Sequence, residues 1–511
     1  MKRLNWAWLL LVLMGVIGVS LVLISTSRYG SGIEPDSVEY ISVARGLLSG
    51  EGFVLHDLTP YITGPPLFPS LLALVGLGGI DPIDSARFIN AAIFGLIVFL
   101  TGFWLLKTLD SLTLALLGSI VILLSAPLIG VSSFILTEAL FILLVLLFIF
   151  ETGRFLKSGN LQALFLSAII TALIWLTRYA GVTVLLTGLV LLLFRRNTPI
   201  KSRLINGTVF GLIATLPIAI WVLRNYFISS TFVGPRQPPS DTFIESIMLN
   251  IYLALSRFSQ FLLPKYVPDM LRILVFSILF ILVGVIIVYV VRHKKDNTSF
   301  IGVEHLIPLL TLVIVYVGFY VISSAIIKYD PINDRLLCPA YIPLVFIVMI
   351  AVKNASVACQ GHRWKHTVSI LLLVFFCIWL TYPALRVTNF IQVRVQKGFD
   401  FVGGEYIIQE WIESELIHYL REHTLQNPVF SNSPEPIFIF TGMRTRSIPR
   451  KYPINDFLEF KEFVSRNEFI YVIWSEYSPK QEKLYDIQEL RSIFDMELVV
   501  KCSDGAVYLV K

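Results

Sequence analysis

Residues 6–25 read WAWLLLVLMGVIGVSLVLIS, and residues 34–53, a little further on, read EPDSVEYISVARGLLSGEGF. The first stretch is apolar and long enough to cross the roughly 30 Å hydrocarbon core of a bilayer as a helix. The second places three carboxylates, those of Glu34, Asp36 and Glu39, directly beside that span. Acidic groups are costly in hydrocarbon and persist near it mainly where they face water, a partner or a reaction. We therefore expect this loop to carry chemistry at a membrane surface.

The composition of the whole chain is that of a polytopic membrane protein. Of its 511 residues, 56% are hydrophobic and only 15% are charged, whereas soluble domains carry about 25% charged residues. The mean hydropathy is +0.75. Apolar runs of sufficient length predict about eleven transmembrane helices. These predicted spans lie near residues 6–25, 87–107, 111–126, 136–151, 161–177, 180–194, 205–224, 272–291, 306–325, 337–353 and 367–385.

The connecting loops alternate between basic and non-basic, which gives the spans a direction. Lys and Arg gather on one side, near residues 2–3, 107, 154–157, 195–203, 292–295 and 353–365. Because short cytoplasmic loops are enriched in these residues, we expect the opposite loops to be extracytoplasmic. Those loops are residues 26–86, 126–135, 225–271, 326–336 and everything after 386. The predicted working face of this cell-membrane protein is therefore the outer one, and the N-terminal run is predicted to stay as an uncleaved first span, since no clear cleavage site follows it.

The charge balance changes near residue 386. From residue 387 on there are 14 Lys and Arg against 18 Asp and Glu. The pattern there predicts a small α/β domain, with helices at 405–421, 434–440, 455–465 and 481–493 and strands at 428–432, 468–474 and 496–510. We expect two domains, a transmembrane part at 1–385 and an extracytoplasmic α/β part at 386–511, the latter for packing or acceptor recognition. No basic stripe with aromatic residues suggests nucleic acid.

Asp36 begins one face of a predicted helix that lies along the membrane surface. Asp36, Glu39, Tyr40, Val43 and Leu47 have the spacing i, i+3, i+4, i+7 and i+11. A purely structural alternative is that Asp36 caps this helix and forms a capping box with Glu39.

Three further charged residues lie at predicted outer ends of spans. Glu138 follows Ser132-Ser133-Phe134-Ile135-Leu136-Thr137; it is a candidate second acid, or it complements the dipole of its own helix. Arg178 and Arg335 suit bidentate binding of a phosphate, although snorkelling at the interface is the alternative. The stretch 67–79, opened by Pro65 and Pro66, is too short to span and is predicted to be a re-entrant or interfacial helix.

Together these stretches resemble the type C glycosyltransferases, multi-span enzymes that use polyprenyl-phosphate sugars, such as protein O-mannosyltransferases and lipid A aminoarabinose transferases. The resemblance covers about residues 1–385 and rests on the order, spacing and common sidedness of five stretches. They are Pro35-Asp36-Ser37-Val38-Glu39-Tyr40 with Ala44 and Gly50, Pro65-Pro66-Leu67-Phe68-Pro69, Thr137-Glu138, Thr177-Arg178-Tyr179-Ala180-Gly181, and Asp334-Arg335-Leu336-Leu337-Cys338-Pro339. The Asp-Glu pair of the protein mannosyltransferases is here Asp36-Ser37, and no soluble repeat interrupts the spans, so the likeness favours the bacterial or archaeal branch.

The resemblance implies that Asp36 is the catalytic acidic residue, with Glu138 as a nearby acid; Glu34 is a further candidate. In an inverting transfer, Asp36 would take the proton of the acceptor hydroxyl, while Arg178, Arg335 or both would hold the departing lipid phosphate. Glu39 and Tyr40 are assigned to substrate positioning.

The partners implied are a polyprenyl-phosphate sugar donor, a glycan, lipid or protein acceptor, and the lipid bilayer. The sequence names no cofactor and leaves a requirement for a divalent metal open.

The main alternative function is that of a transporter or flippase of a lipid-linked intermediate. Such proteins usually show two similar halves, and we find no internal repeat. A non-catalytic envelope scaffold is a third reading, which leaves the placement of Asp36 and Glu138 unexplained.

Overall fold

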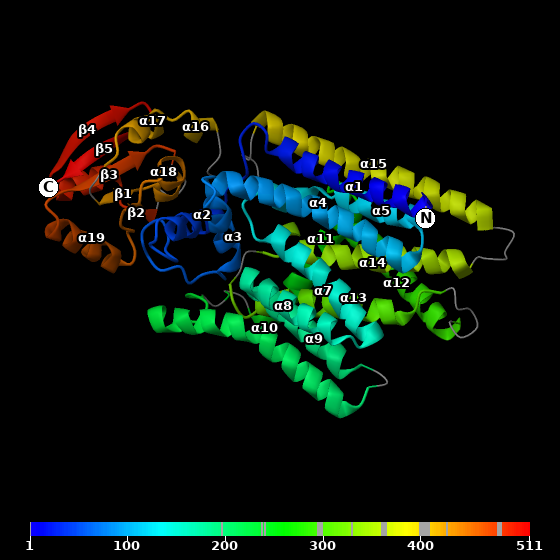
Figure 1. Ribbon diagram of the computed structural model, residues 1–511. Helices are drawn as coiled ribbons and strands as arrows, with labels where there is room; N and C mark the ends of the chain where they lie inside the picture. Colours follow the sequence, from blue (N-terminus) through cyan, green and yellow to red (C-terminus); the bar gives the residue numbers. More distant parts are fainter. Residues whose placement is uncertain are drawn as a thin grey trace. The chain divides into compact units, whose positions relative to one another are not determined.

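The computed structural model describes residues 2–195, 198–236, 239, 242–293, 300–328, 331–358, 365–397, 409–425, 428–477 and 483–511. The chain forms two compact units (Figure 1). The helical unit contains Met1–Ser25, Ile62–Phe68 and Arg87–Gln392, and the sheet unit contains Thr26–Tyr61, Pro69–Ala86 and Val393–Lys511.

The helical unit is built from long apolar helices, and every predicted span falls on one of them or on a closely spaced pair. Within the described residues, seven helices are long and apolar enough to cross a membrane: α1 (Lys2–Ser25), α4 (Pro82–Leu109), α7 (Glu138–Ser158), α10 (Ile200–Ser229), α12 (Asp269–His293), α13 (Val303–Ser323) and α14 (Asp334–Ala358). Helices α5 (Leu112–Leu123) and α6 (Ala126–Ser133) form a pair bent by 54°, and together they are long and apolar enough to cross a membrane. The unit also contains α8 (Leu161–Thr177), the 3-10 turn η1 (Tyr179–Gly181), α9 (Val182–Leu193), α11 (Phe243–Leu262) and most of α15 (Lys365–Lys397).

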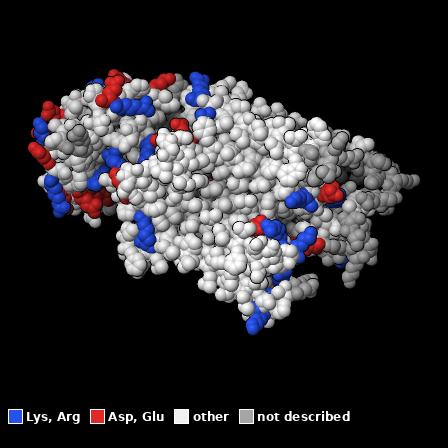
Figure 2. All heavy atoms as spheres, viewed as in Figure 1, with Lys and Arg blue, Asp and Glu red and all other residues white. Residues whose placement is uncertain are grey.

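These helices expose apolar side chains that a soluble protein would bury. In the apolar stretch of α12, only 6% of the residues are buried. The face seen in Figure 2 carries few charged side chains over the helices and many over the C-terminal sheet. The predicted fold class, an α-helical polytopic membrane protein with a small C-terminal sheet domain, is confirmed; the number eleven stays a prediction.

Helices α1 and α4 approach closely at two glycines. A Cβ atom on Gly95 would lie 2.7 Å from the carbonyl oxygen of Gly15 and 2.5 Å from Val19. Because hydrophobic burial does not drive helices together inside a bilayer, small residues that let backbones approach are a common means of association there.

The sheet unit joins the first loop to the C-terminal region. The loop contains α2 (Pro35–Leu48) and, across the division between the units, α3 (Leu67–Gly76). The C-terminal region contains α16 (Gln409–Ile412), α17 (Glu415–Glu422), β1 (Val429–Ser431), α18 (Pro434–Thr441), β2 (Thr445–Ser447), α19 (Ile454–Arg466), β3 (Ile470–Ser475), α20 (Ile487–Ile493), β4 (Met496–Cys502) and β5 (Gly505–Val510).

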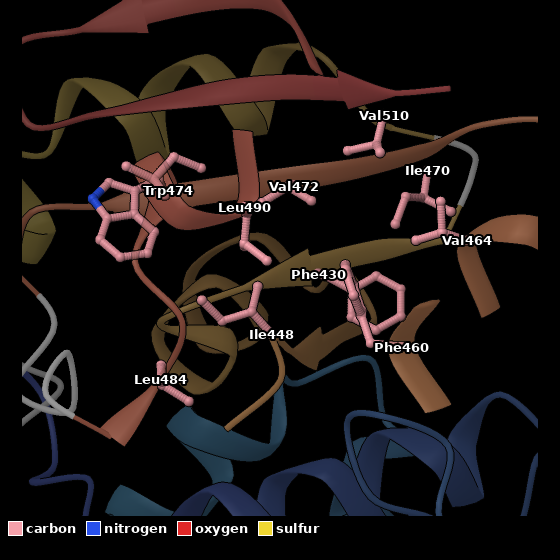
Figure 3. Close-up of a cluster of buried hydrophobic side chains, with 11 residues drawn as sticks. Phe430, Ile448, Phe460, Val464, Ile470, Val472, Trp474, Leu484, Leu490 and Val510 are labelled. Carbon is pink, nitrogen blue, oxygen red and sulfur yellow. The ribbon is translucent and has the colours of Figure 1, made fainter. Parts of the chain in front are cut away.

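The five strands form one sheet in the order β2-β1-β3-β5-β4. Strand β1 is parallel to β2 and β3, whereas β5 is antiparallel to β3 and β4. One side of the sheet packs against α19 and α20 through a core that includes Phe430, Phe460, Val472 and Leu490 (Figure 3).

The predicted elements of this region agree with the structure except in three places. The short edge strand β2 was not predicted, and the predicted helix 405–421 is divided into α16 and α17, with residues 405–408 outside the described residues. The predicted helix 481–493 is observed only as α20 from Ile487 on, and residues 481–482 lie outside the described residues. The predicted division at 385/386 falls inside α15. That division did not anticipate that the first loop packs with the C-terminal region.

Candidate active site

Helix α2, which carries Asp36, begins in a defined way. Glu34 is its N-cap residue and Pro35 occupies the first helical turn, where a proline loses no helical hydrogen bond. The backbone N–H of Glu34 donates to Oγ of Ser37 at 3.0 Å. The alternative role for Asp36, a capping box with Glu39, is therefore wrong: Glu34 holds the capping position and Asp36 lies within the first turn.

The predicted face of α2 is partly buried and partly open. Val43 is fully buried and Tyr40 is 9% exposed, while Asp36, Glu39 and Leu47 have intermediate exposure. The carboxylates of this face are therefore held on an ordered helix without being sealed in its core.

The C-terminal end of α2 is fixed to the C-terminal region within the sheet unit. Arg45 donates to the carbonyl of Phe438 at 3.1 Å, and its guanidinium lies 5.2 Å from the centre of that ring. Arg444 covers the same ring at 5.4 Å, donates to the carbonyl of Leu55 at 3.1 Å, and pairs with Glu51. At the N-terminal end of α2, the charge of Glu34 acts on Arg394 of α15: burial lowers the pKa of Arg394 to about 10, and Glu34 opposes that shift.

In the helical unit, Glu138, Arg178 and Arg335 meet. Arg178 Nη1 lies 2.5 Å from Glu138 Oε1, and Arg335 Nε pairs with the same oxygen. Arg178 also donates to Oγ1 of Thr137 at 2.8 Å. Glu138 is only 1% exposed, and the two arginine side chains are 16% and 21% exposed.

The chain path explains this meeting. Helices α7 and α8 are joined by a tight turn at Gly159, so the first residue of α7, Glu138, and the residue that ends α8, Arg178, lie at the same end of the pair. The turn η1 packs back onto α8, because a Cβ on Gly181 would lie 2.4 Å from Cα of Trp175. Helix α14, which begins Asp334-Arg335, packs against α7 and supplies the third member.

A second ion pair extends this site. Asp334 Oδ2 accepts from Arg386 Nη2 at 3.2 Å, and Arg386 Nη1 donates to the backbone carbonyl of Gln260 at 3.1 Å. We call Glu138, Arg178, Arg335, Asp334, Arg386 and Gln260 the polar network. It contains three guanidiniums and two carboxylates, and so carries a net charge of about +1.

The predicted site residues thus fall into two groups. Glu138, Arg178 and Arg335 lie together in the helical unit, whereas Glu34, Asp36, Glu39 and Tyr40 lie on or next to α2 in the sheet unit. Sequence reasoning missed Arg386 and Gln260. An arginine one residue beyond a predicted span was the only signal for Arg386, and a lone glutamine gave none.

Among the described residues, no group of three or more His, Cys, Asp and Glu side chains is placed to hold a metal ion.

The sheet unit also contains an open groove of about 600 Å³, whose lining includes Asp57, Phe463, Arg446, Arg450 and Glu459. Both signs of charge and an aromatic ring face this groove.

Comparison with solved structures identifies the fold. ArnT from Cupriavidus metallidurans bound to undecaprenyl phosphate matches with a TM-score of 0.63 and 13% identity, over 98% of this chain and 97% of that one. Its apo form gives the same score and identity, over 100% and 98%. The oligosaccharyltransferase AglB from Archaeoglobus fulgidus, in complex with an inhibitory peptide and a dolichol-phosphate, matches with a TM-score of 0.55 and 11% identity, over 94% and 70%. No protein-family model matches the chain, and neither does any curated protein.

These matches define the fold of the chain. The neighbours belong to the type C glycosyltransferases, and the chain has their fold along nearly its whole length. The resemblance inferred from the five sequence stretches is confirmed at the level of the fold.

Proposed function

We propose that this protein is a membrane glycosyltransferase that moves a sugar from a polyprenyl-phosphate donor to an acceptor hydroxyl on the extracytoplasmic face. The observation that carries the proposal is the grouping of the partly buried Arg178 and Arg335 around the buried carboxylate of Glu138. This grouping lies in a fold whose solved examples bind undecaprenyl phosphate or dolichol-phosphate.

The charge of the grouping matches the donor. Two arginines and one glutamate leave a net charge of about +1, and a phosphodiester that links a sugar to a prenyl chain carries one negative charge. When the bond to the sugar breaks, the departing phosphate gains a second negative charge. Cationic groups that are already held near the departing phosphate oxygen stabilise its negative charge as it develops. Arg178 and Arg335 would therefore favour departure of the lipid phosphate.

Asp36 is the proposed general base. It would accept the proton of the acceptor hydroxyl as that oxygen attacks the anomeric carbon from the face opposite the phosphate. Glu39 and Tyr40, on the same face of α2, would position the substrate. The interaction of Glu34 with Arg394 and its place at the N-cap favour a structural role for Glu34.

We assign Glu138 a positioning role in place of the catalytic one. Its Oε1 atom forms ion pairs with both arginines, and the residue is almost fully buried. A carboxylate held in this way orients the two guanidiniums toward a phosphate and keeps their mutual repulsion small.

The sheet unit is the proposed site of acceptor recognition. Its groove presents Arg446 and Glu459 beside the ring of Phe463, a mixture of donors, acceptors and apolar surface suited to a glycan. Because α2 is fixed to this unit through Arg45, Arg444 and Phe438, the acceptor would be bound by the unit that carries the base.

Replacement of Arg335 tests the phosphate site. Arg335→Ala should weaken binding of undecaprenyl phosphate by about 1.5–3 kcal/mol, the scale of a hydrogen bond to a charged group. Arg335→Lys should recover only part of this, because an ammonium lacks the bidentate fork. Binding to the detergent-solubilised protein measures both. Arg154→Ala is the control, since Arg154 forms an exposed pair with Glu151 on α7; unchanged affinity in both Arg335 variants would remove this residue from the phosphate site.

The proposed sidedness is tested by thiol labelling in a background without the four native cysteines. A cysteine at Ser492 in the sheet unit should react with an impermeant reagent added to intact cells whose outer layer has been made permeable. A cysteine at Lys201, in a predicted cytoplasmic loop, should react only after lysis. The reverse pattern would invert the topology and rule out an extracytoplasmic reaction.

A further inference from the structure

The polar network contains three buried oxygen atoms that accept no hydrogen bond. They are Oε2 of Glu138, Oδ1 of Asp334 and Oε1 of Gln260, and none has a donor in the described part of the chain. Buried polar atoms are nearly always paired, so each exception calls for an explanation. Here three exceptions belong to residues of the one polar network.

Ion pairs, one hydrogen bond and one peptide bond link the three residues. Arg335 binds Glu138 and follows Asp334 directly in the sequence. Asp334 binds Arg386, and Arg386 donates to the backbone carbonyl of Gln260. The unpaired oxygen of Glu138 belongs to the carboxylate that binds both arginines assigned to the donor phosphate. The unpaired oxygens of Asp334 and Gln260 belong to the two residues that Arg386 contacts.

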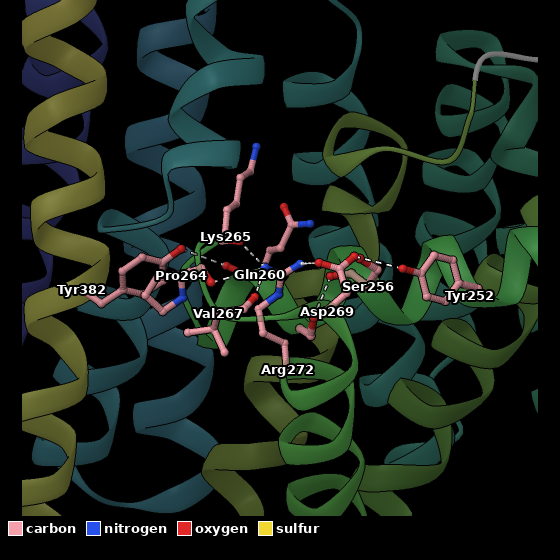
Figure 4. Close-up of polar contacts among 10 residues, drawn as sticks. Tyr252, Ser256, Gln260, Pro264, Lys265, Val267, Asp269, Arg272 and Tyr382 are labelled. Atoms are coloured by element: carbon pink, nitrogen blue, oxygen red, sulfur yellow. Dashed lines mark hydrogen bonds and ion pairs between the residues drawn. The ribbon is translucent and has the colours of Figure 1, made fainter.

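Gln260 is held firmly in this place. Its carbonyl oxygen also accepts from the hydroxyl of Tyr382 at 3.3 Å (Figure 4). The connection that follows it is fixed by Arg272, which is 2% exposed and donates through Nη1 to the carbonyls of Lys265 and Val267 at 2.7 and 2.8 Å. Asp269 contacts Arg272 and accepts from Tyr252 and Ser256, each at 3.0 Å. With its backbone fixed and its side chain 6% exposed, Gln260 cannot readily turn its amide oxygen toward bulk water.

The chemistry of the unpaired atoms differs from that of the arginines. A phosphodiester at neutral pH has acceptor oxygens and no hydrogen-bond donor, so it can satisfy guanidiniums but not carboxylate or amide oxygens. A sugar ring carries several hydroxyl donors. The network thus offers donors for a phosphate and, adjoining them, acceptors for hydroxyl groups.

We infer that Gln260, Asp334 and Glu138 form a recognition site for the hydroxyl groups of the donor sugar, with Gln260 as a specificity-determining residue. This inference rests on the proposed function, because it places a sugar beside the phosphate held by Arg178 and Arg335. A site built to bind a substrate hydroxyl discriminates strongly against an analogue that lacks it. Selectivity among sugars would thus come from these three acceptors.

The test compares Gln260→Leu with the wild-type full-length protein in detergent. The probes are undecaprenyl phosphate and undecaprenyl phosphates that carry glucose, mannose, galactose or arabinose. Gln260→Leu should weaken binding of the sugar-bearing lipid that the wild type prefers by about tenfold, the factor of one hydrogen bond. It should leave binding of undecaprenyl phosphate unchanged, whereas Arg335→Ala should weaken both.

Monodeoxy analogues of the preferred donor provide a measurement on the unmodified protein. Wild type should lose about tenfold in affinity when the hydroxyl that faces Gln260 is replaced by hydrogen, and Gln260→Leu should be insensitive to that replacement. Thr101→Val is the matched control, since Thr101 also has a buried oxygen without a partner but lies outside the network.

Two results would overturn this inference and leave the proposed function standing. One is equal loss for sugar-bearing and bare lipid in Gln260→Leu, which indicates a purely structural role. The other is wild-type affinity that does not depend on any single hydroxyl, which indicates oxygens satisfied by water. Failure of the wild type to bind either lipid would overturn the proposed function as well.

Discussion

Asp36→Asn should abolish most of the transfer activity while leaving the fold intact. Loss of a positioned general base lowers the rate by about 10²–10⁴-fold, and asparagine has nearly the same shape but cannot take up the proton. The structural cost should be small, because Asp36 is not the N-cap of α2. Loss of its charge from the first helical turn costs roughly 0.3–1 kcal/mol. The assay is the release of polyprenyl phosphate, with thermal unfolding measured on the same preparation.

Asp84→Asn is the matched control for this prediction. Asp84 also lies in the first turn of a helix, α4, which begins with Pro82. It should show the same small change in stability and no change in rate. A well-folded Asp36→Asn protein that transfers sugar at the wild-type rate would remove Asp36 as the base, and Glu34 would be the next residue to test.

Glu138→Ala should destabilise the protein strongly. Removing one partner of a buried ion pair leaves uncompensated charge and typically costs 3–5 kcal/mol, and here two guanidiniums lose their common partner. Thermal unfolding in detergent should therefore occur at a markedly lower temperature. Added undecaprenyl phosphate should stabilise this variant more than the wild type, because the phosphate supplies the missing negative charge.

The same helix provides a control for Glu138. Glu151 pairs with Arg154 at 2.9 Å on α7, with Arg154 more than half exposed, and exposed pairs contribute at most about 1 kcal/mol. Glu151→Ala should thus change stability little. If Glu138→Ala instead unfolded like the wild type but lost its activity, Glu138 would act as a catalytic acid and the positioning role would be wrong.

The two groups of proposed site residues are held by different units of the chain. Asp36 lies on α2, which is tied through Arg45 and Arg444 to Phe438 and Glu51 of the sheet unit. The phosphate site is held within the helical unit by α7, α8 and α14. The proposed base and the proposed phosphate site therefore belong to different compact units of the chain.

Much of the fold was readable from local patterns. The length of apolar runs predicts helices in a bilayer whatever surrounds them, so each predicted span falls on a helix or a closely spaced pair. Alternation and turn residues likewise predicted β1, β3, β4 and β5. The edge strand β2 is only three residues long, too short for any periodic signal, and it forms because β1 provides a partner.

The candidate site was likewise predictable only in part from the local sequence. Local sequence identified Asp36, Glu138, Arg178 and Arg335, because charged residues beside apolar spans stand out against their surroundings. It could not decide that Glu138 receives both arginines, or that Arg386 and Gln260 complete the network. Those pairings join α7, α8, α11, α14 and α15 across as many as 197 residues of sequence. Burial, hydrogen bonding and charge compensation between distant residues depend on which helices pack together, and only the tertiary structure decides that.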